Sequence, residues 1–148
     1  MLSNFIKSNK IIQIMQPKKL KYNKIHKKKF QKFKYKTFLL KFGVYGLKSL
    51  ESGFVSSYQF KTLKYVILKN FKKQGKIWYN TFPNFPVTAK PIEVRMGKGK
   101  GNLKHWSFFV PSGFLILEVF SIINISKVLS HLKKGQLKLP MKTKIVFQ

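Results

Sequence analysis

The chain has 148 residues, enough for one domain with a buried core and a short tail. Its 31 Lys and Arg residues face only 3 acidic residues, which gives a formal net charge of +28 at pH 7. Because a compact state with this charge repels itself, we expect a polyanionic partner such as nucleic acid. The absence of cysteine excludes a disulfide framework, a thiolate metal site and a cysteine nucleophile.

The composition also argues against an enzyme and against a membrane-spanning protein. The acids are Glu51, Glu93 and Glu118 and there is no aspartate, so carboxylate metal sites and acid–base pairs are hard to build. The three histidines lie far apart in sequence, so we expect neither a shared metal site nor a cofactor. The longest apolar run, Phe114 to Ile125, is shorter than the ~18 residues that a bilayer span needs.

The first part of the chain is expected to be an extension followed by a basic arm. Residues 1–14 contain no arginine and are a poor match to a targeting presequence, so we interpret them as an N-terminal extension. Residues 15–36 are dense in lysine with no acid to pair with, which predicts an extended arm that orders against phosphates. Aromatic residues interleaved with these lysines could stack on bases or guide the arm back to the core.

A strand and a helix are predicted next. Thr37 to Ser52 is apolar and aromatic, and its glycines at 43 and 46 indicate a bend or bulge. Ser56 and Gln59 form a capping box, and Gly75 is expected to supply a left-handed helix stop. The residues expected to form the buried stripe of this helix are Phe60, Leu63, Ile67 and Phe71, whereas its lysines, including Lys64, occupy other positions.

Further strands surround a glycine-lysine loop. Lys76 to Phe82 has strand composition and is ended by Pro83 to Pro86, and a short strand is expected at Ile92 to Val94. The loop follows as residues 95–104. His105 to Val110 and Phe114 to Phe120 are then expected to pair as a hairpin around the turn at residues 111–113.

The C-terminal part is predicted to be a helix and a last strand. The helix opens at Asn124, buries Val128, Leu129 and Leu132, and is weakened at its end by Gly135. Thr143 to Phe147 closes the chain as a strand. The order of elements predicts one α+β domain at residues 37–148, with two helices packed on one face of a mostly antiparallel sheet.

The glycine-lysine loop, Arg95 to Asn102, is the most informative stretch. Gly97, Gly99 and Gly101 alternate with lysines, so the backbone can approach an anion closely while the side chains neutralise it. Arg95 is the only arginine of the chain, which favours a contact that needs a planar, bidentate donor such as one to phosphate or guanine. The alternative is a solvated hairpin tip.

Several segments together resemble a known family. They are Gln16 to Lys19, Lys24 to Lys27, Phe42 to Lys48, Lys73 to Trp78, Phe82 to Thr88, Val94 to Asn102 and Lys138 to Pro140. In order and spacing they resemble the bacterial-type L-sixteen family of large-ribosomal-subunit proteins. This resemblance implies a structural, non-enzymatic protein that binds large-subunit rRNA near the aminoacyl-tRNA site and the peptidyl-transferase region, supports late subunit assembly, and contacts neighbouring ribosomal proteins. It leaves open whether the loop touches aminoacyl-site tRNA or only the rRNA around it.

The candidate rRNA-binding residues combine the cationic arm and loop with the family segments. They are Lys18, Lys19, Lys21, Lys24, His26, Lys27, Lys76, Arg95, Lys98 and Lys100, with close backbone approach at Gly97, Gly99 and Gly101. A composition rich in Phe, Ile, Lys, Asn and Tyr indicates AT-rich coding DNA, which favours a mitochondrial origin over a plastid or an AT-rich bacterium. The alternative functions are a cationic membrane-surface protein and a general nucleic-acid-binding protein.

Overall fold

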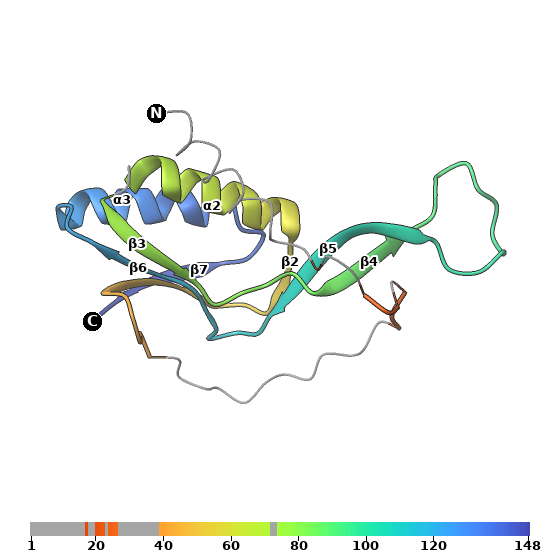
Figure 1. The fold of residues 1–148 in the computed structure, drawn as a ribbon, viewed down its shortest axis with the longest axis horizontal. Helices are drawn as coiled ribbons and strands as arrows, with labels where there is room; N and C mark the ends of the chain where they lie inside the picture. The colour runs from red at the N-terminus through yellow and green to blue at the C-terminus, as the bar shows by residue number, and fades with distance from the viewer. Residues whose placement is uncertain (1–16, 18–19, 23, 27–38, 72–73) are drawn as a thin grey trace.

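The fold is seen in a computed structural model, which describes residues 17, 20–22, 24–26, 39–71 and 74–148 (Figure 1). In this part of the chain the helices are α2 (Ser57–Phe71) and α3 (Ile125–Gln136). The strands are β1 (Tyr45–Ser49), β2 (Gly53–Ser56), β3 (Gly75–Tyr79), β4 (Phe85–Ala89), β5 (Asn102–Val110), β6 (Leu115–Ser121) and β7 (Thr143–Phe147). Most of the basic arm and the whole extension at residues 1–14 lie outside the described residues.

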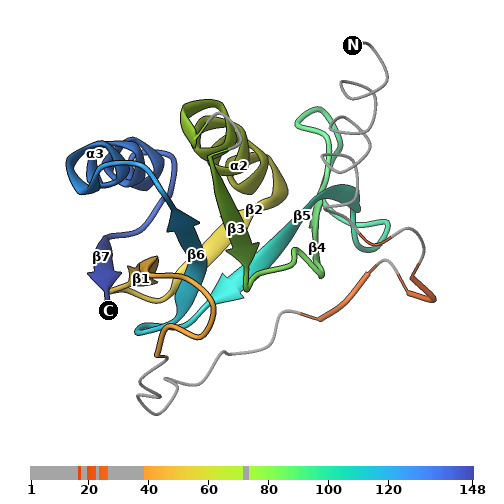
Figure 2. The ribbon, with the colours of Figure 1, turned by 60° about the vertical axis from the view of Figure 1, so that its left-hand side comes forward.

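The strands form two antiparallel sheets. One has four strands in the order β3-β6-β1-β7, and the other has three in the order β2-β5-β4. The two helices lie side by side over one face of the four-stranded sheet, and the three-stranded sheet extends away from them (Figures 1 and 2). The predicted α+β class is therefore confirmed, with the one expected sheet replaced by two.

Helix α2 begins as its sequence predicts. The backbone N–H of Ser56 donates to Gln59 Oε1 (2.9 Å), and the N–H of Gln59 donates to Ser56 Oγ (3.2 Å), which is a complete capping box. The four residues of the predicted apolar stripe are all buried in the core. The expectation for Lys64 was wrong, because its side chain is also buried and its ammonium lies 5.3 Å from the centre of the Tyr79 ring. Burial lowers the pKa of Lys64.

The predicted hairpin between residues 105–110 and 114–120 was wrong, because β5 and β6 belong to different sheets. The chain crosses between the sheets at the turn after Val110, and Ser49 at the end of β1 holds that crossing. Ser49 Oγ donates to the Pro111 carbonyl (2.7 Å) and accepts the N–H of Phe114 (3.0 Å). The polar groups of this turn are therefore satisfied by β1, so the strands on either side of the turn, β5 and β6, need not pair with each other.

Residues 92–94 do not form the predicted strand. They are exposed and lie in the loop, and the strand that enters the loop is instead β4, which includes the Phe85 and Pro86 that were expected to end a strand. Proline is tolerated there because β4 is an edge strand of the three-stranded sheet. Pro86 therefore marks an edge strand and does not end a strand as predicted.

Two glycines have roles other than those predicted. Gly75 is the first residue of β3 and does not have a positive φ, so it is no left-handed helix stop. A Cβ on Gly75 would lie 2.5 Å from the Phe120 carbonyl oxygen, so the close pairing of β3 with β6 requires glycine. Gly135 does not end α3, which continues to Gln136; it is buried against Leu63 and Ile67 of α2.

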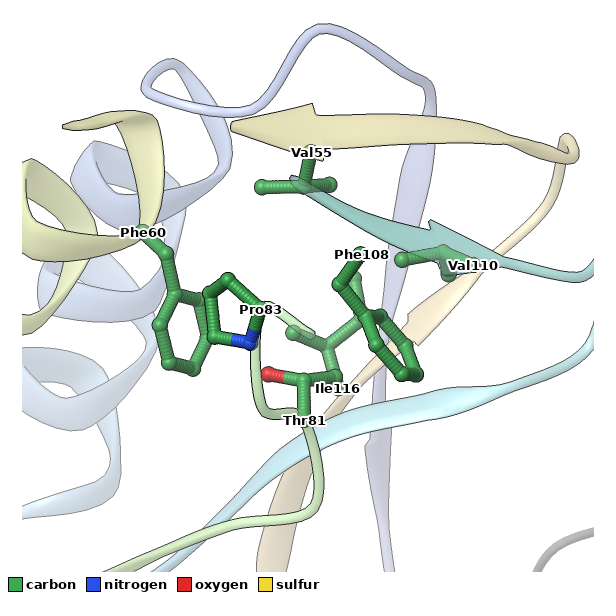
Figure 3. A pocket seen from close by; sticks show the side chains of 7 residues that line it. All are labelled: Val55, Phe60, Thr81, Pro83, Phe108, Val110 and Ile116. Carbon is green, nitrogen blue, oxygen red and sulfur yellow. The ribbon is translucent and has the colours of Figure 1, made fainter. Parts of the chain in front are cut away.

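The two sheets and α2 meet in an apolar junction, shown in Figure 3. The side chains that line it are Val55, Phe60, Thr81, Pro83, Phe108, Val110 and Ile116. The space between them has no room for a water molecule, so it is core packing and offers no ligand site. Among the described residues, no helix is long and apolar enough to cross a bilayer, and no three His or acidic side chains gather as metal ligands.

Candidate nucleic-acid interface

The glycine-lysine loop lies at the far end of β4 and β5, away from the helices (Figure 1). Residues 91–100 are all exposed. Arg95 therefore lies within the loop and not at a strand edge, as the predicted strand at 92–94 would have placed it. The connection between β4 and β5 spans residues 90–101, so it begins before the predicted bounds of 95–104 and ends where β5 begins at Asn102. From here on, the loop means residues 90–101.

The backbone at the loop tip adopts left-handed conformations. Gly97 has φ 102° and Gly99 has φ 76°, and Lys98 between them has φ 53°, the only positive value at a non-glycine residue in the described chain. Side chains other than glycine are strained there by about 1–2 kcal/mol. A Cβ built on Gly97 or Gly99 would meet nothing within 4 Å, so this backbone is open to a partner.

Gly101 is required for a different reason. A Cβ at this position would lie 2.4 Å from the Ala89 carbonyl oxygen and 2.7 Å from the Lys90 nitrogen, so the close approach is to the chain's own β4. The three glycines thus divide into two that shape the tip and one that closes the neck of the loop.

The arm and the loop meet in the structure. The ammonium of Lys24 donates to the Lys100 carbonyl (2.9 Å), and the ammonium of Lys100 donates to the Ile25 carbonyl. Within the loop, the Lys90 ammonium donates to the Gly97 carbonyl. Residues separated by 76 positions in sequence therefore share one cationic surface.

The other predicted site residues are placed as follows. Lys21 and His26 are exposed in the described part of the arm, and Arg95 and Lys98 are exposed in the loop. Lys18, Lys19 and Lys27 lie outside the described residues. Lys76 is exposed in β3, in the four-stranded sheet near the helices, so the structure does not bring it to the loop (Figure 1).

A groove of about 720 Å³ lies at the base of the loop. Ile25 of the arm, Lys100 of the loop and Gln59 of α2 line part of it, and one face of the three-stranded sheet lines the rest. That face carries aromatic rings, with the ring centre of Phe54 5.8 Å from Phe85 and 5.4 Å from Phe109. Aromatic rings beside ammonium groups suit the bases and phosphates of nucleic acid. No local pattern in the sequence indicates this face, because its aromatic rings come from three separate strands.

The segment that follows the arm is fixed by a buried carboxylate. Glu118 in β6 is 1% exposed, and its Oε2 accepts the backbone N–H groups of Lys41 (3.0 Å), Phe42 (2.8 Å) and Gly43 (3.0 Å). Its Oε1 accepts the side-chain amide of Asn80 (3.2 Å). Burial raises the pKa of Glu118, but these four hydrogen bonds outweigh burial and hold the pKa below its ordinary value. The carboxylate is thus a charged anchor for residues 41–43, which lie between the arm and β1.

The cationic surface is not neutralised from within. In the described chain the one ion pair joins exposed Lys142 to Glu51 at 3.3 Å. Glu118 is occupied by amides, and Glu93 is exposed within the loop itself. With a formal net charge of +28, the surface remains complementary to a polyanion.

These features define a class: a single basic α+β domain that presents a cationic arm and loop together. Comparison with known proteins gives the family. The family model of ribosomal protein L16p/L10e matches residues 17–146, so the chain belongs to that family.

Individual relatives agree with this assignment. The large ribosomal subunit protein uL16 of Buchnera aphidicola subsp. Baizongia pistaciae is 42% identical over 135 residues, which cover 90% of this chain and 96% of the relative. Cereibacter sphaeroides uL16 is 39% identical with the same coverage. The large ribosomal subunit protein uL16c of Euglena longa is 40% identical over 91% of this chain and 99% of its own length.

The Glu118 anchor generates a stability prediction. We expect Glu118→Gln to lower the free energy of unfolding by about 3 kcal/mol, because a carboxamide has one acceptor oxygen for N–H groups that each gain about 1.5–3 kcal/mol from a charged partner. Urea titration measures the change. Glu51→Gln, which removes the same charge from an exposed ion pair, should change the value by no more than about 1 kcal/mol. Equal losses in both variants would contradict the anchor.

The same anchor predicts a dependence on acid. Since the pKa of Glu118 is lower in the folded chain than in the unfolded chain, its contribution is fully present above the unfolded value of about 4.3 and is lost as pH falls through the lowered folded value. His131 contributes at higher pH. Burial lowers its pKa below 6.5, so the folded chain also loses stability as pH falls and His131 becomes protonated. In urea titrations below pH 4.5, the parent chain should therefore lose more stability than Glu118→Gln.

The loop neck generates a third prediction. Gly101→Ala should open the end of the β4–β5 pair, because the new Cβ meets backbone atoms that cannot turn away. Hydrogen exchange should then be faster at Asn102 and Leu103, which pair with Ala89 and Thr88. Gly99→Ala adds the same methyl group where space is open, so it should strain the tip and leave those amides protected. Unchanged protection in Gly101→Ala would contradict this role of the neck.

Proposed function

We propose that the chain is a structural constituent of the large ribosomal subunit that binds large-subunit rRNA through its arm and loop. The observation that carries the proposal is the contact between Lys24 of the arm and Lys100 of the loop, which gathers cations from two distant segments on one surface. The relatives support it, since proteins of about 40% identity over nearly the whole chain are named as large-subunit proteins. The role requires binding and positioning of RNA and no catalytic step.

The mechanism is neutralisation of closely spaced phosphates. The lysines that would supply it are Lys18, Lys19, Lys21, Lys24, Lys27, Lys98 and Lys100. The open backbone at Gly97 and Gly99 permits close approach of RNA, and Arg95 supplies the one planar fork for an oriented contact. His26 is exposed beside the arm–loop contact and adds a further donor for RNA. Lys76, on the four-stranded sheet, would contact a different part of the rRNA.

The proposal extends to a location within the subunit. The resemblance of the loop segment to its family supports a position near the aminoacyl-tRNA site and the peptidyl-transferase region, with the loop facing that site and neighbouring ribosomal proteins around the domain. Aminoacyl-site tRNA is included as a candidate partner of the loop. The AT-rich composition supports a mitochondrial ribosome as the compartment.

Sedimentation tests the assignment directly. A tagged copy expressed in the source organism should migrate with large ribosomal subunits on sucrose gradients and should be enriched with mitochondrial ones. The same copy should not float with anionic vesicles that lack RNA, which a membrane-surface protein would do. Recovery only in free fractions would overturn the proposal, and recovery with subunits of another compartment would overturn the mitochondrial part alone.

Salt dependence and two variants test the mechanism. With about eight phosphate contacts, affinity for a large-subunit rRNA transcript should fall by about three to five orders of magnitude between 50 and 200 mM salt. Lys98→Gln should weaken binding and make the slope of log affinity against log salt shallower by about one. Arg95→Lys keeps the charge and should keep the slope, yet it should lose protection of one RNA position in footprinting. Identical footprints and slopes for both variants would remove the special role of Arg95.

A further inference from the structure

A second cationic surface lies on the helical layer. A groove of about 350 Å³ lies between α2 and the C-terminal end of α3 with the turn that follows it. Its cations are Lys69, Lys134 and Lys138, and its other lining residues include Tyr65, Asn70 and Leu137. We call it the lysine groove. In Figure 1 the helices lie toward one end of the long axis and the loop at the other, and the lysine groove shares no lining residue with the groove at the base of the loop.

We propose that the lysine groove binds the phosphate backbone of a second segment of rRNA. The three lysines that line it are exposed, and all three acids of the chain are engaged or located elsewhere. Glu51 pairs with Lys142, Glu118 binds backbone amides, and Glu93 lies in the loop. The groove therefore concentrates positive charge that the protein itself does not neutralise.

The lysines of the groove are not needed to satisfy the helix ends. The backbone N–H of Gln74 donates to the Phe71 carbonyl at the end of α2 (2.7 Å). At the end of α3, the N–H groups of Lys138 and Leu139 donate to the carbonyls of Gly135 and Gln136 (both 3.0 Å). These terminal carbonyls thus have backbone partners and do not require the lysine ammonium groups of the groove.

The chemistry of the groove favours RNA over other polyanions. Tyr65 is 60% exposed at the groove and offers a ring for a base or a ribose, while Asn70 supplies a neutral donor. An anionic bilayer would need an apolar face to insert beneath the cations, but of these groove residues only Leu137 is an exposed large aliphatic side chain. The proposal rests on the proposed rRNA binding and adds a second contact surface to it.

The geometry of the helix pair supports a preformed groove. Gly135 brings α3 close to α2, because a Cβ there would lie 3.1 Å from Leu63 Cδ1 and 3.4 Å from Ile67 Cδ1. The helices pack through buried apolar residues beneath the groove, so its lysines project from a fixed framework. Cations carried on an ordered backbone lose less backbone entropy on binding than cations on a flexible tail.

The test compares two triple variants of the full chain on a large-subunit rRNA transcript from the same genome. The groove variant is Lys69→Gln, Lys134→Gln and Lys138→Gln. The matched control is Lys127→Gln, Lys133→Gln and Lys144→Gln, which removes the same charge from exposed lysines on α3 and β7 outside the groove. We expect the groove variant to bind at least tenfold more weakly at 0.1 M salt, with a slope shallower by about two to three, and the control to change less than half as much.

Three outcomes decide the proposal. If the groove variant loses protection of one RNA segment and Lys98→Gln loses protection of a different segment, the second site is supported. Equal loss in the groove variant and the control shows a bulk charge effect and overturns it. An unchanged affinity together with a lower Tm in the groove variant assigns these lysines to helix stability and also overturns it.

The loop variant separates this inference from the proposed function. If Lys98→Gln weakens binding and the groove variant does not, the second site is wrong and the proposed rRNA binding stands. If the parent chain binds the transcript without salt dependence and neither variant has an effect, the proposed function itself fails, and the second site fails with it.

Discussion

The fold depends on one carboxylate placed where the sheet and the arm must be joined. Glu118 lies in β6, which pairs with both β1 and β3, so its position is fixed by two neighbouring strands. Three consecutive backbone N–H groups that converge on one oxygen make a strong anion site, and here the anion belongs to the protein itself. Phe42 adds a ring stacked at 5.9 Å from Trp78 in β3. The position of residues 41–43, just before β1, is thus set by a charge and a ring together.

The loop shows how a highly charged segment can hold a defined shape. Lys24 of the arm and Lys100 of the loop were predicted only as contacts to phosphate, yet each also binds a carbonyl of the other segment. Lys90, which was not among the predicted residues, binds the Gly97 carbonyl. An ammonium group has three donors, so a lysine that makes one internal hydrogen bond can still contact a phosphate. Partial ordering of Lys24 and Lys100 before RNA arrives reduces the entropy lost on binding. The same residues therefore serve both the internal geometry and the external contact.

Several local signals in the sequence predicted the structure correctly, although the predicted helix stop at Gly75 and the predicted strand at 92–94 were wrong. The contacts between distant segments were not predicted. The capping box at Ser56 and Gln59 and the strand Thr143–Phe147 were predicted from adjacent residues and are present. The predicted hairpin is absent because Ser49, about sixty positions earlier in sequence, hydrogen-bonds to the turn where the chain crosses from one sheet to the other. Glu118 was noted only as a charge inside an apolar run, since nothing nearby shows that amides from another segment will surround it. The loop and arm residues could be named individually, but their contact is a product of the fold.

The domain that lies between the two cationic surfaces would couple them mechanically. A protein that held RNA only at its loop could tolerate motion in the helices, whereas one that also held RNA across α2 and α3 would transmit any shift of the helices to the loop. Few elements separate α2 from the loop. Helix α2 follows β2 directly, and β2 pairs with β5, which leads out of the loop. Phe60 of α2 packs without room for water at the junction with Val55 of β2 and with Phe108 and Val110 of β5. A rigid link of this kind fixes the spacing of two RNA segments, and this spacing is what a structural ribosomal protein can contribute beyond neutralising charge.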